Sequence, residues 1–194
     1  MIFHDVEQNS EAWMELKRGK FSSSTFGDLF MNENTAGYRN AIYKVVYERL
    51  TGETPESFSG NWMERGHEFE PEAKEKYELL TFNKVSNGGF FELNEWVGSS
   101  PDGCVKPGLT EFKCPKYSTM IDYLIEKKLP KIYEKQVQGQ LYVTDAEWCD
   151  FSPFHPKLKP LIIRVERDEK MIKEIEDKLN ESIEKAKQLI KQLK

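Results

Sequence analysis

The sequence predicts an α/β protein, α+β in some classification schemes, in which a central mixed β-sheet is flanked by α-helices. Two observations carry this prediction: helical patterns occupy both ends of the chain, and a meander of short strands lies between them. A further helix and two more strands follow the meander, an order that favours a layered sheet with helices on its faces. The length of 194 residues is typical of one domain, so we expect a single domain over residues 1–194.

The helices of the first half are predicted from apolar spacing and from residues that start helices. Residues 13–18 are typical of a short helix or turn. Thr25, with Asp28 three positions later, resembles a capping box at the start of the next helix. Residues 38–51 and 62–80 carry apolar side chains at helical spacing, so we expect two longer helices there.

The second half is expected to alternate strands and helices. Short apolar runs bounded by turn residues predict strands in residues 84–98 (two strands), 108–114, 146–154 and 161–165. Helices are expected over residues 117–128 and 133–143 and, as an amphipathic C-terminal helix, over residues 168–194.

The composition excludes several classes of protein. The formal net charge is −5, which argues against non-specific coating of nucleic acid but not against an enzyme that acts on it. No apolar run approaches the ~20 residues of a membrane helix, and the first residues lack the basic and apolar segments of a secretory signal. Three scattered cysteines are too few for a disulfide framework. We therefore expect a cytoplasmic protein with no membrane partner.

The residues with the clearest chemistry lie in the middle of the chain. Asp102 occupies a Pro-Asp-Gly turn between two expected strands. Glu111 and Lys113 are two positions apart on the next strand and so point to one face, whereas Phe112 points to the other. Two carboxylates and an ammonium group are therefore expected to converge.

Such a group suits the hydrolysis of phosphodiesters. Two carboxylates can hold Mg²⁺, or Mn²⁺, which polarises the phosphate and the attacking water. A lysine beside the ion can orient or deprotonate that water and neutralise developing charge. The bare pattern often occurs by chance as a simple turn followed by a surface pair, so the surrounding residues have to decide. Glu70 on a helix and Gln136 with Gln140, one turn apart on another, could complete such a site or only form polar helix faces.

The sequence resembles the lambda exonuclease family, the viral-type alkaline exonucleases of the PD-(D/E)-x-K nuclease superfamily. The matching stretches lie in family order along most of the chain: WMELKRG (13–19), SSS (22–24), WMERGHEFEPEA (62–73), SSPDG (99–103), EFKCP (111–115), YEKQVQ (133–138) and VERDEK (165–170). The SSPDG and EFKCP stretches are the most specific, and the others gain weight as an ordered set. The resemblance implies a restriction-endonuclease-like core.

The resemblance also implies roles for individual residues. Asp102, Glu111, the backbone carbonyl of Phe112 and the helical Glu70 would be ligands of Mg²⁺. Asp102, Glu111, Lys113 and Gln136 would form the catalytic group. Gln136 and Tyr133 would form the helix motif that supports the site, and Tyr133 would also contact DNA. Gln138 takes the place of Gln136 if the alignment is shifted by two residues.

The N-terminal stretch would bind the terminal 5′-phosphate. Lys17 or Arg18, next to Ser24 at a helix start, offers positive charge and backbone N–H groups to an anion. The family has an arginine followed by an apolar residue before the glycine, whereas this chain has Lys17-Arg18-Gly19. Either Lys17 takes the place of the arginine or Arg18 reaches in from a shifted register. Ser100, beside Asp102, is a further candidate for phosphate contact.

The expected function is therefore that of a Mg²⁺-dependent 5′-to-3′ exonuclease on linear double-stranded DNA. By resemblance it would leave 3′ single strands for a single-strand annealing protein, form a homotrimeric ring around DNA, and be phage-encoded and active in the host cytoplasm. A RecB-like structure-specific or single-strand DNA nuclease is the first alternative. A catalytically silent protein that binds DNA ends is the second.

Overall fold

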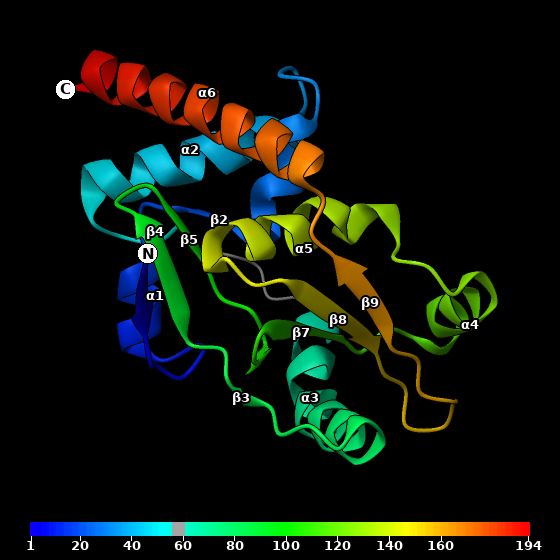
Figure 1. Cartoon of the computed structure of the whole chain (residues 1–194). Helices are drawn as coiled ribbons and strands as arrows, with labels where there is room; N and C mark the ends of the chain where they lie inside the picture. The colour runs from blue at the N-terminus through cyan, green and yellow to red at the C-terminus, as the bar shows by residue number, and fades with distance from the viewer. Residues whose placement is uncertain (56–60) are drawn as a thin grey trace.

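The α/β prediction is confirmed, but the strands form two mixed sheets instead of one central sheet (Figure 1). The computed structural model describes residues 1–55 and 61–194, with the backbone alone for residues 61–67. Among the described helices, none combines the length and the apolar character that crossing a membrane requires.

The first sheet contains strands from the N-terminus and from the middle of the chain. Its spatial order is β1 (Ile2–His4), β4 (Phe90–Asn94), β5 (Val97–Ser99) and β2 (Phe21–Ser22). Neighbours are antiparallel except β5 and β2, which are parallel.

The second sheet carries the Glu-Phe-Lys sequence. Its spatial order is β3 (Ser86–Asn87), β6 (Gly103–Val105), β7 (Gly108–Lys113), β8 (Trp148–Pro153) and β9 (Ile163–Glu166). Only β7 and β8 are parallel, with Glu111 opposite Phe151.

The chain passes from the first sheet to the second between β5 and β6. Pro101 lies at this passage and has no N–H group with which to extend a strand ladder. The predicted mixed sheet with flanking helices is thus present as two sheets, and the Pro-Asp-Gly turn is one of the places where the chain crosses between them. This bend leaves Asp102 at the junction of the two sheets.

Helices cover the sheets on several sides (Figure 1). They are α1 (Glu11–Lys17), the 3₁₀ helix η1 (Ser23–Phe30), α2 (Ala36–Thr51), α3 (Asn61–Thr81), α4 (Tyr117–Glu126), α5 (Lys131–Thr144) and α6 (Glu169–Leu193). The amphipathic α6 buries its apolar face within the chain, where Ile175 and Leu179 join one core cluster with Ile42 and Val45 of α2.

The second sheet lies between α5 and α3. On one face Leu109 of β7 clusters with Val137 and Leu141 of α5. On the other face Phe112 clusters with Ala73 and Tyr77 of α3. Side chains on one face of β7 therefore contact α5, and side chains on the other face contact α3.

The 3₁₀ helix η1 packs directly on α5. The ring of Phe26 lies so close to Gly139 that a Cβ added there would stand 2.3 Å from its Cδ2. Only glycine permits this approach. The predicted capping box does not form: the Thr25 hydroxyl donates to the carbonyl of Ser22, and the helix starts at Ser23. The serine-rich start of η1 is thereby held close to the helix that carries Gln136.

Candidate active site

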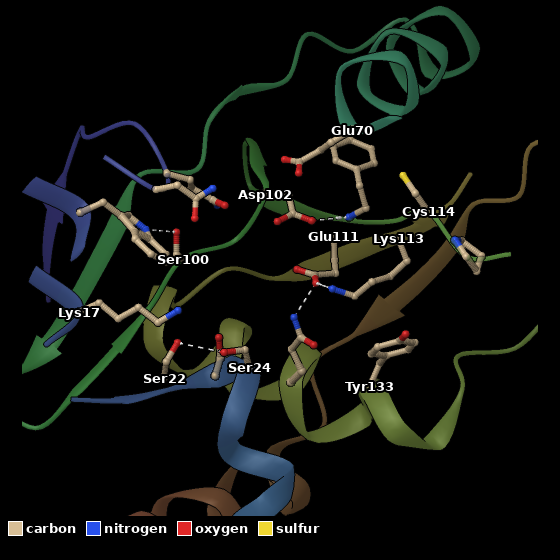
Figure 2. A pocket seen from close by; sticks show the side chains of 17 residues that line it. Lys17, Ser22, Ser24, Glu70, Ser100, Asp102, Glu111, Lys113, Cys114 and Tyr133 are labelled. Atoms are coloured by element: carbon tan, nitrogen blue, oxygen red, sulfur yellow. Dashed lines mark hydrogen bonds and ion pairs between the residues drawn. The ribbon is translucent and has the colours of Figure 1, made fainter. Parts of the chain in front are cut away.

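A cavity of about 530 Å³ lies between α1, η1, α3, α5 and the strands β5 to β7 (Figure 2). Ten of the eleven residues proposed for the site from the sequence line it, and Arg18 is the exception. These ten are Lys17, Ser24, Glu70, Ser100, Asp102, Glu111, Phe112, Lys113, Tyr133 and Gln136. The fold thus brings residues from distant parts of the sequence into the lining of one cavity.

Asp102 is fixed by the bend between the two sheets. Its Oδ2 accepts a hydrogen bond from the backbone N–H of Phe112 over 2.7 Å, which ties the bend to β7. Gly88 lies against the same bend, where an added Cβ would stand 1.8 Å from the carbonyl oxygen of Pro101. A side chain at position 88 would therefore force either this bend or the Gly88 segment to move.

Glu111 and Lys113 point to the face of β7 that α5 covers. The Lys113 ammonium group contacts Oε1 of Glu111. Nε2 of Gln136 donates to the same oxygen over 2.5 Å. The Tyr133 ring centroid lies 5.4 Å from the Lys113 Nζ. The alternation along β7 that the sequence predicts therefore places the carboxylate and the lysine side by side.

Gln140 is a further contact that the predicted site omitted. Its Nε2 donates over 2.5 Å to Oε2 of Glu111, so both carboxylate oxygens are held by α5. The spacing of four residues from Gln136 was the signal, since it puts the two amides on one helix face. Gln138 points elsewhere: it donates to the carbonyl of Glu166 and accepts from the N–H of Asp168.

The electrostatics of this group are strongly coupled. Burial raises the pKa of Asp102 well above its ordinary value, and the Glu111 carboxylate raises it further. Burial alone would lower the pKa of Lys113, but Glu111 and Asp102 hold that pKa above its ordinary value. The cavity therefore concentrates negative charge and keeps Lys113 as an ammonium group.

The donor atoms fit Mg²⁺. The carboxylates of Asp102 and Glu111, the carboxylate of Glu70 and the Phe112 backbone offer hard oxygen atoms around one cavity. Figure 2 shows Glu70 reaching from α3 into the space beside Asp102. Among the described residues no three His, Cys, Asp or Glu side chains are grouped closely enough to form a ready-made metal site. Mg²⁺ usually keeps several waters, so oxygen donors that surround a cavity without forming a closed site can bind it together with water.

Lys17 lies at the other end of the cavity (Figure 2). Its Nζ stands 4.3 Å from the centroid of the Trp13 ring. Burial, with a smaller effect of Lys44, lowers the pKa of Lys17 to about 8. Arg18 instead leaves its Nε buried without a hydrogen-bond partner in the described part of the chain. The structure therefore places Lys17, not Arg18, in the cavity.

The start of η1 lies beside Lys17. Ser24 is exposed there, and no described side chain caps the first turn of the helix. Backbone N–H groups at a helix start favour an anion. Together with Lys17 they form a pocket suited to a phosphate group.

Ser100 has its hydroxyl proton already engaged. Its Oγ donates to the carbonyl of Gly89 over 2.6 Å and accepts from the Trp13 Nε1 over 2.9 Å. A hydroxyl group has one proton to donate. In this arrangement Ser100 holds the Trp13 ring under Lys17 and has no proton left for a phosphate.

The chain belongs to the family of the YqaJ-like viral recombinase domain, whose model matches residues 12–147. This membership confirms the resemblance drawn from the sequence motifs. None of the curated proteins compared with the chain matches it.

Solved structures extend the comparison to nearly the whole chain. An alkaline exonuclease (LHK-Exo) from Laribacter hongkongensis is 32% identical, with a TM-score of 0.88 over 95% of this chain and 96% of that one. A complex of LHK-Exo with dAMP matches at a TM-score of 0.88 and 31% identity, over 95% of this chain and 96% of that one. A phage related exonuclease from Haemophilus somnus 129PT shares the fold, with a TM-score of 0.70 and 18% identity over 93% of this chain and 100% of that one.

Proposed function

We propose that this protein is a Mg²⁺-dependent exonuclease that digests one strand of linear double-stranded DNA from its 5′ end. Family membership and the likeness to an alkaline exonuclease support the assignment to enzymes that cut DNA. The single observation that carries the finer proposal is the shared cavity. It has a carboxylate–lysine group at one end, and Lys17 with the serine-rich start of η1 at the other.

The carboxylate end is proposed as the cutting site. Asp102, Glu111, Glu70 and the Phe112 carbonyl would hold Mg²⁺, which supplies polarisation of the scissile phosphate. The Lys113 ammonium group would neutralise charge that develops on the phosphate. Gln136 would keep the Glu111 carboxylate in place, and Tyr133 would line the path of the strand.

The cationic end is proposed to read the DNA terminus. The Lys17 ammonium, the Ser24 hydroxyl and the backbone N–H groups of η1 would bind the 5′-phosphate. Trp13, held by Ser100, would support Lys17 through its ring face. Because lysine lacks the bidentate fork of arginine, we expect a weaker requirement for the phosphate.

The wider proposal follows the family. Residues 1–194 would form one exonuclease domain that assembles into a homotrimeric ring around DNA. The enzyme would work in the host cytoplasm and leave 3′ single strands for a single-strand annealing protein. A ring accommodates the net charge of −5, because only the inner surface has to be basic.

The decisive experiment compares two forms of one DNA. Purified protein and Mg²⁺ are incubated with a closed circle and with the same circle linearised to give 5′-phosphates, with Lys113→Ala as control. Loss of label from the 5′ ends of the linear form alone, absent in Lys113→Ala, is the expected result. Nicking of the circle would instead favour a RecB-like structure-specific nuclease. Tight end binding without cleavage would favour a silent end-binding protein.

A further inference from the structure

Acidic residues are absent from two segments, one that continues from β7 and one that continues from β8. No Asp or Glu lies between Glu111 and Asp122, although Lys113 and Lys116 do. None lies between Asp150 and Glu166, a stretch that holds Lys157 and Lys159. The whole chain has 33 acidic and 28 basic residues, so two segments that carry basic but no acidic residues differ clearly from the average of the chain.

The topology brings these two segments to one edge. They follow β7 and β8, which are parallel neighbours with Lys113 opposite Pro153. The carboxyl ends of parallel strands lie at the same edge of a sheet, the edge where α/β proteins bind their ligands. Figure 1 shows α4 and the β8–β9 connection leaving the sheet on this side.

The connection between β8 and β9, residues 154–162, is here called the basic loop. It is fixed to the catalytic strand: the N–H of Phe154 donates over 2.7 Å to the carbonyl of Lys113 itself. The Leu158 N–H closes a turn on the carbonyl of His155, and the Ser152 hydroxyl donates to the carbonyl of Leu161. Two prolines further restrict the backbone. The loop thus holds its charges in a defined position.

Lys157 and Lys159 are both exposed on this loop. Neither ammonium group pairs with a carboxylate in the described part of the chain, unlike Lys173 or Lys187 on α6. Unpaired lysines on a loop that is joined to the strand of Lys113 are suited to phosphate oxygens of a polynucleotide.

We propose that the basic loop binds the phosphodiester backbone of the DNA next to the cutting site, through Lys157 and Lys159. The inference rests on the proposed function and adds a DNA contact outside the cavity, whose lining does not include either residue. The loop binds the DNA backbone independently of base sequence, because ammonium groups interact with phosphates as point charges.

The salt dependence of DNA binding tests this contact. Each lysine–phosphate contact contributes about 0.9 to the slope of log K against log salt concentration for duplex DNA. The double variant Lys157→Gln/Lys159→Gln should therefore lower that slope by about 1.8. Binding of a fluorescent duplex with a 5′-phosphate is measured by anisotropy in EDTA, so that the DNA stays intact, from low to physiological salt.

The matched control is Lys191→Gln/Lys194→Gln at the C-terminal end of α6. It removes the same charge from exposed residues on a helix that lies on the far side of the molecule (Figure 1). Its slope should equal that of the wild type. In digestion assays with Mg²⁺, the loop variant should raise KM and leave kcat within about twofold, because the lysines do not touch the scissile phosphate. Thermal unfolding checks that both variants are folded.

The outcomes separate the two proposals. An unchanged slope in the loop variant, or an equal fall in the control, would overturn the loop contact while leaving the exonuclease intact. Loss of kcat with unchanged slope would also overturn it. A wild-type protein with neither DNA affinity nor digestion of linear DNA would overturn the proposed function and the loop contact with it.

Discussion

Gln140 donates a hydrogen bond to Glu111 over 2.5 Å in the interior of the protein, where the glutamine is 0% and the glutamate 1% exposed. Gln136 and Lys113 hold the other carboxylate oxygen from the cavity side. The orientation of the proposed metal ligand is therefore set from both sides, by a buried amide and by residues that face the substrate.

The first prediction separates these two amides. Gln140→Met leaves a buried carboxylate oxygen without its donor, which costs about 1–3 kcal/mol or more for a charged group. We expect a lower free energy of unfolding in urea and slower digestion of linear DNA. Gln136→Met, at the cavity surface, should slow digestion with a smaller loss of stability. A Gln140→Met variant as stable and as active as the wild type would contradict the holding role.

The second prediction concerns pH and Lys17. Because its pKa is lowered to about 8, the ammonium group predominates below pH 8 and the neutral amine above it. A preference for 5′-phosphoryl over 5′-hydroxyl ends should therefore be present at pH 7 and decline as the pH rises. Bound phosphate favours the ammonium form and moves the decline to higher pH. The ratio of initial rates on the two ends, from pH 7 to pH 10, measures it.

Lys17→Arg provides the control for this pH effect. A guanidinium group stays charged throughout that range, so the preference should persist to pH 10. Lys17→Met should remove the preference at every pH. If Arg18→Gln removes it instead, then Arg18 reads the terminus and the placement of Lys17 has another purpose.

The third prediction tests the metal ligands. Asp102→Asn keeps the shape of the side chain but removes its negative charge, so the protein should lose most of its Mg²⁺ affinity in calorimetry. The hydrogen bond from the Phe112 N–H can persist to the amide oxygen, which limits the effect on folding. Undiminished Mg²⁺ binding by Asp102→Asn would remove Asp102 from the metal site.

The fourth prediction concerns a buried contact that holds α3 on the sheet. The Tyr77 hydroxyl donates over 2.7 Å to Asp150, which also accepts two hydrogen bonds from Arg164. Tyr77→Phe should lower the free energy of unfolding by about 1–3 kcal/mol, because a buried carboxylate loses a donor. Urea denaturation measures it, with the exposed Tyr47→Phe as the matched control. Equal midpoints for the two variants would show that the contact adds nothing to stability.

The sequence predicted the long elements well for a physical reason. The amphipathic pattern of α6 and the alternation of β7 both reflect which side faces a core, and both patterns are present in the residues themselves. Three short strands, β1, β2 and β6, were not predicted, and the two strands expected in residues 84–98 are three, β3, β4 and β5. A segment of two or three residues is too short to show the alternation of apolar and polar side chains that marks a strand. Its pairing is determined by partners distant in the sequence, such as Phe91 for β1 and Val97 for β2.

The candidate site was predicted as a set of residues, but its arrangement was predicted only for the carboxylates and the lysine that were expected to converge. Motif order and residue chemistry pointed to Asp102, Glu111 and Lys113, and the cavity brings them together. Whether Lys17 or Arg18 enters the cavity depends on the residue at which α1 ends, and the sequence does not locate a helix end to within one residue. The engagement of the Ser100 hydroxyl by Gly89 and Trp13 depends on contacts far apart in the sequence, so no local pattern could reveal it.

The contact between Phe26 and Gly139 has a consequence for the geometry of the cavity. It joins the 3₁₀ helix that begins beside Lys17 to the helix that orients Glu111. The two ends of the cavity are therefore parts of one packed framework. In the proposed exonuclease, this packing would set the spacing between the bound terminus and the bond that is cut, whatever the length of the duplex.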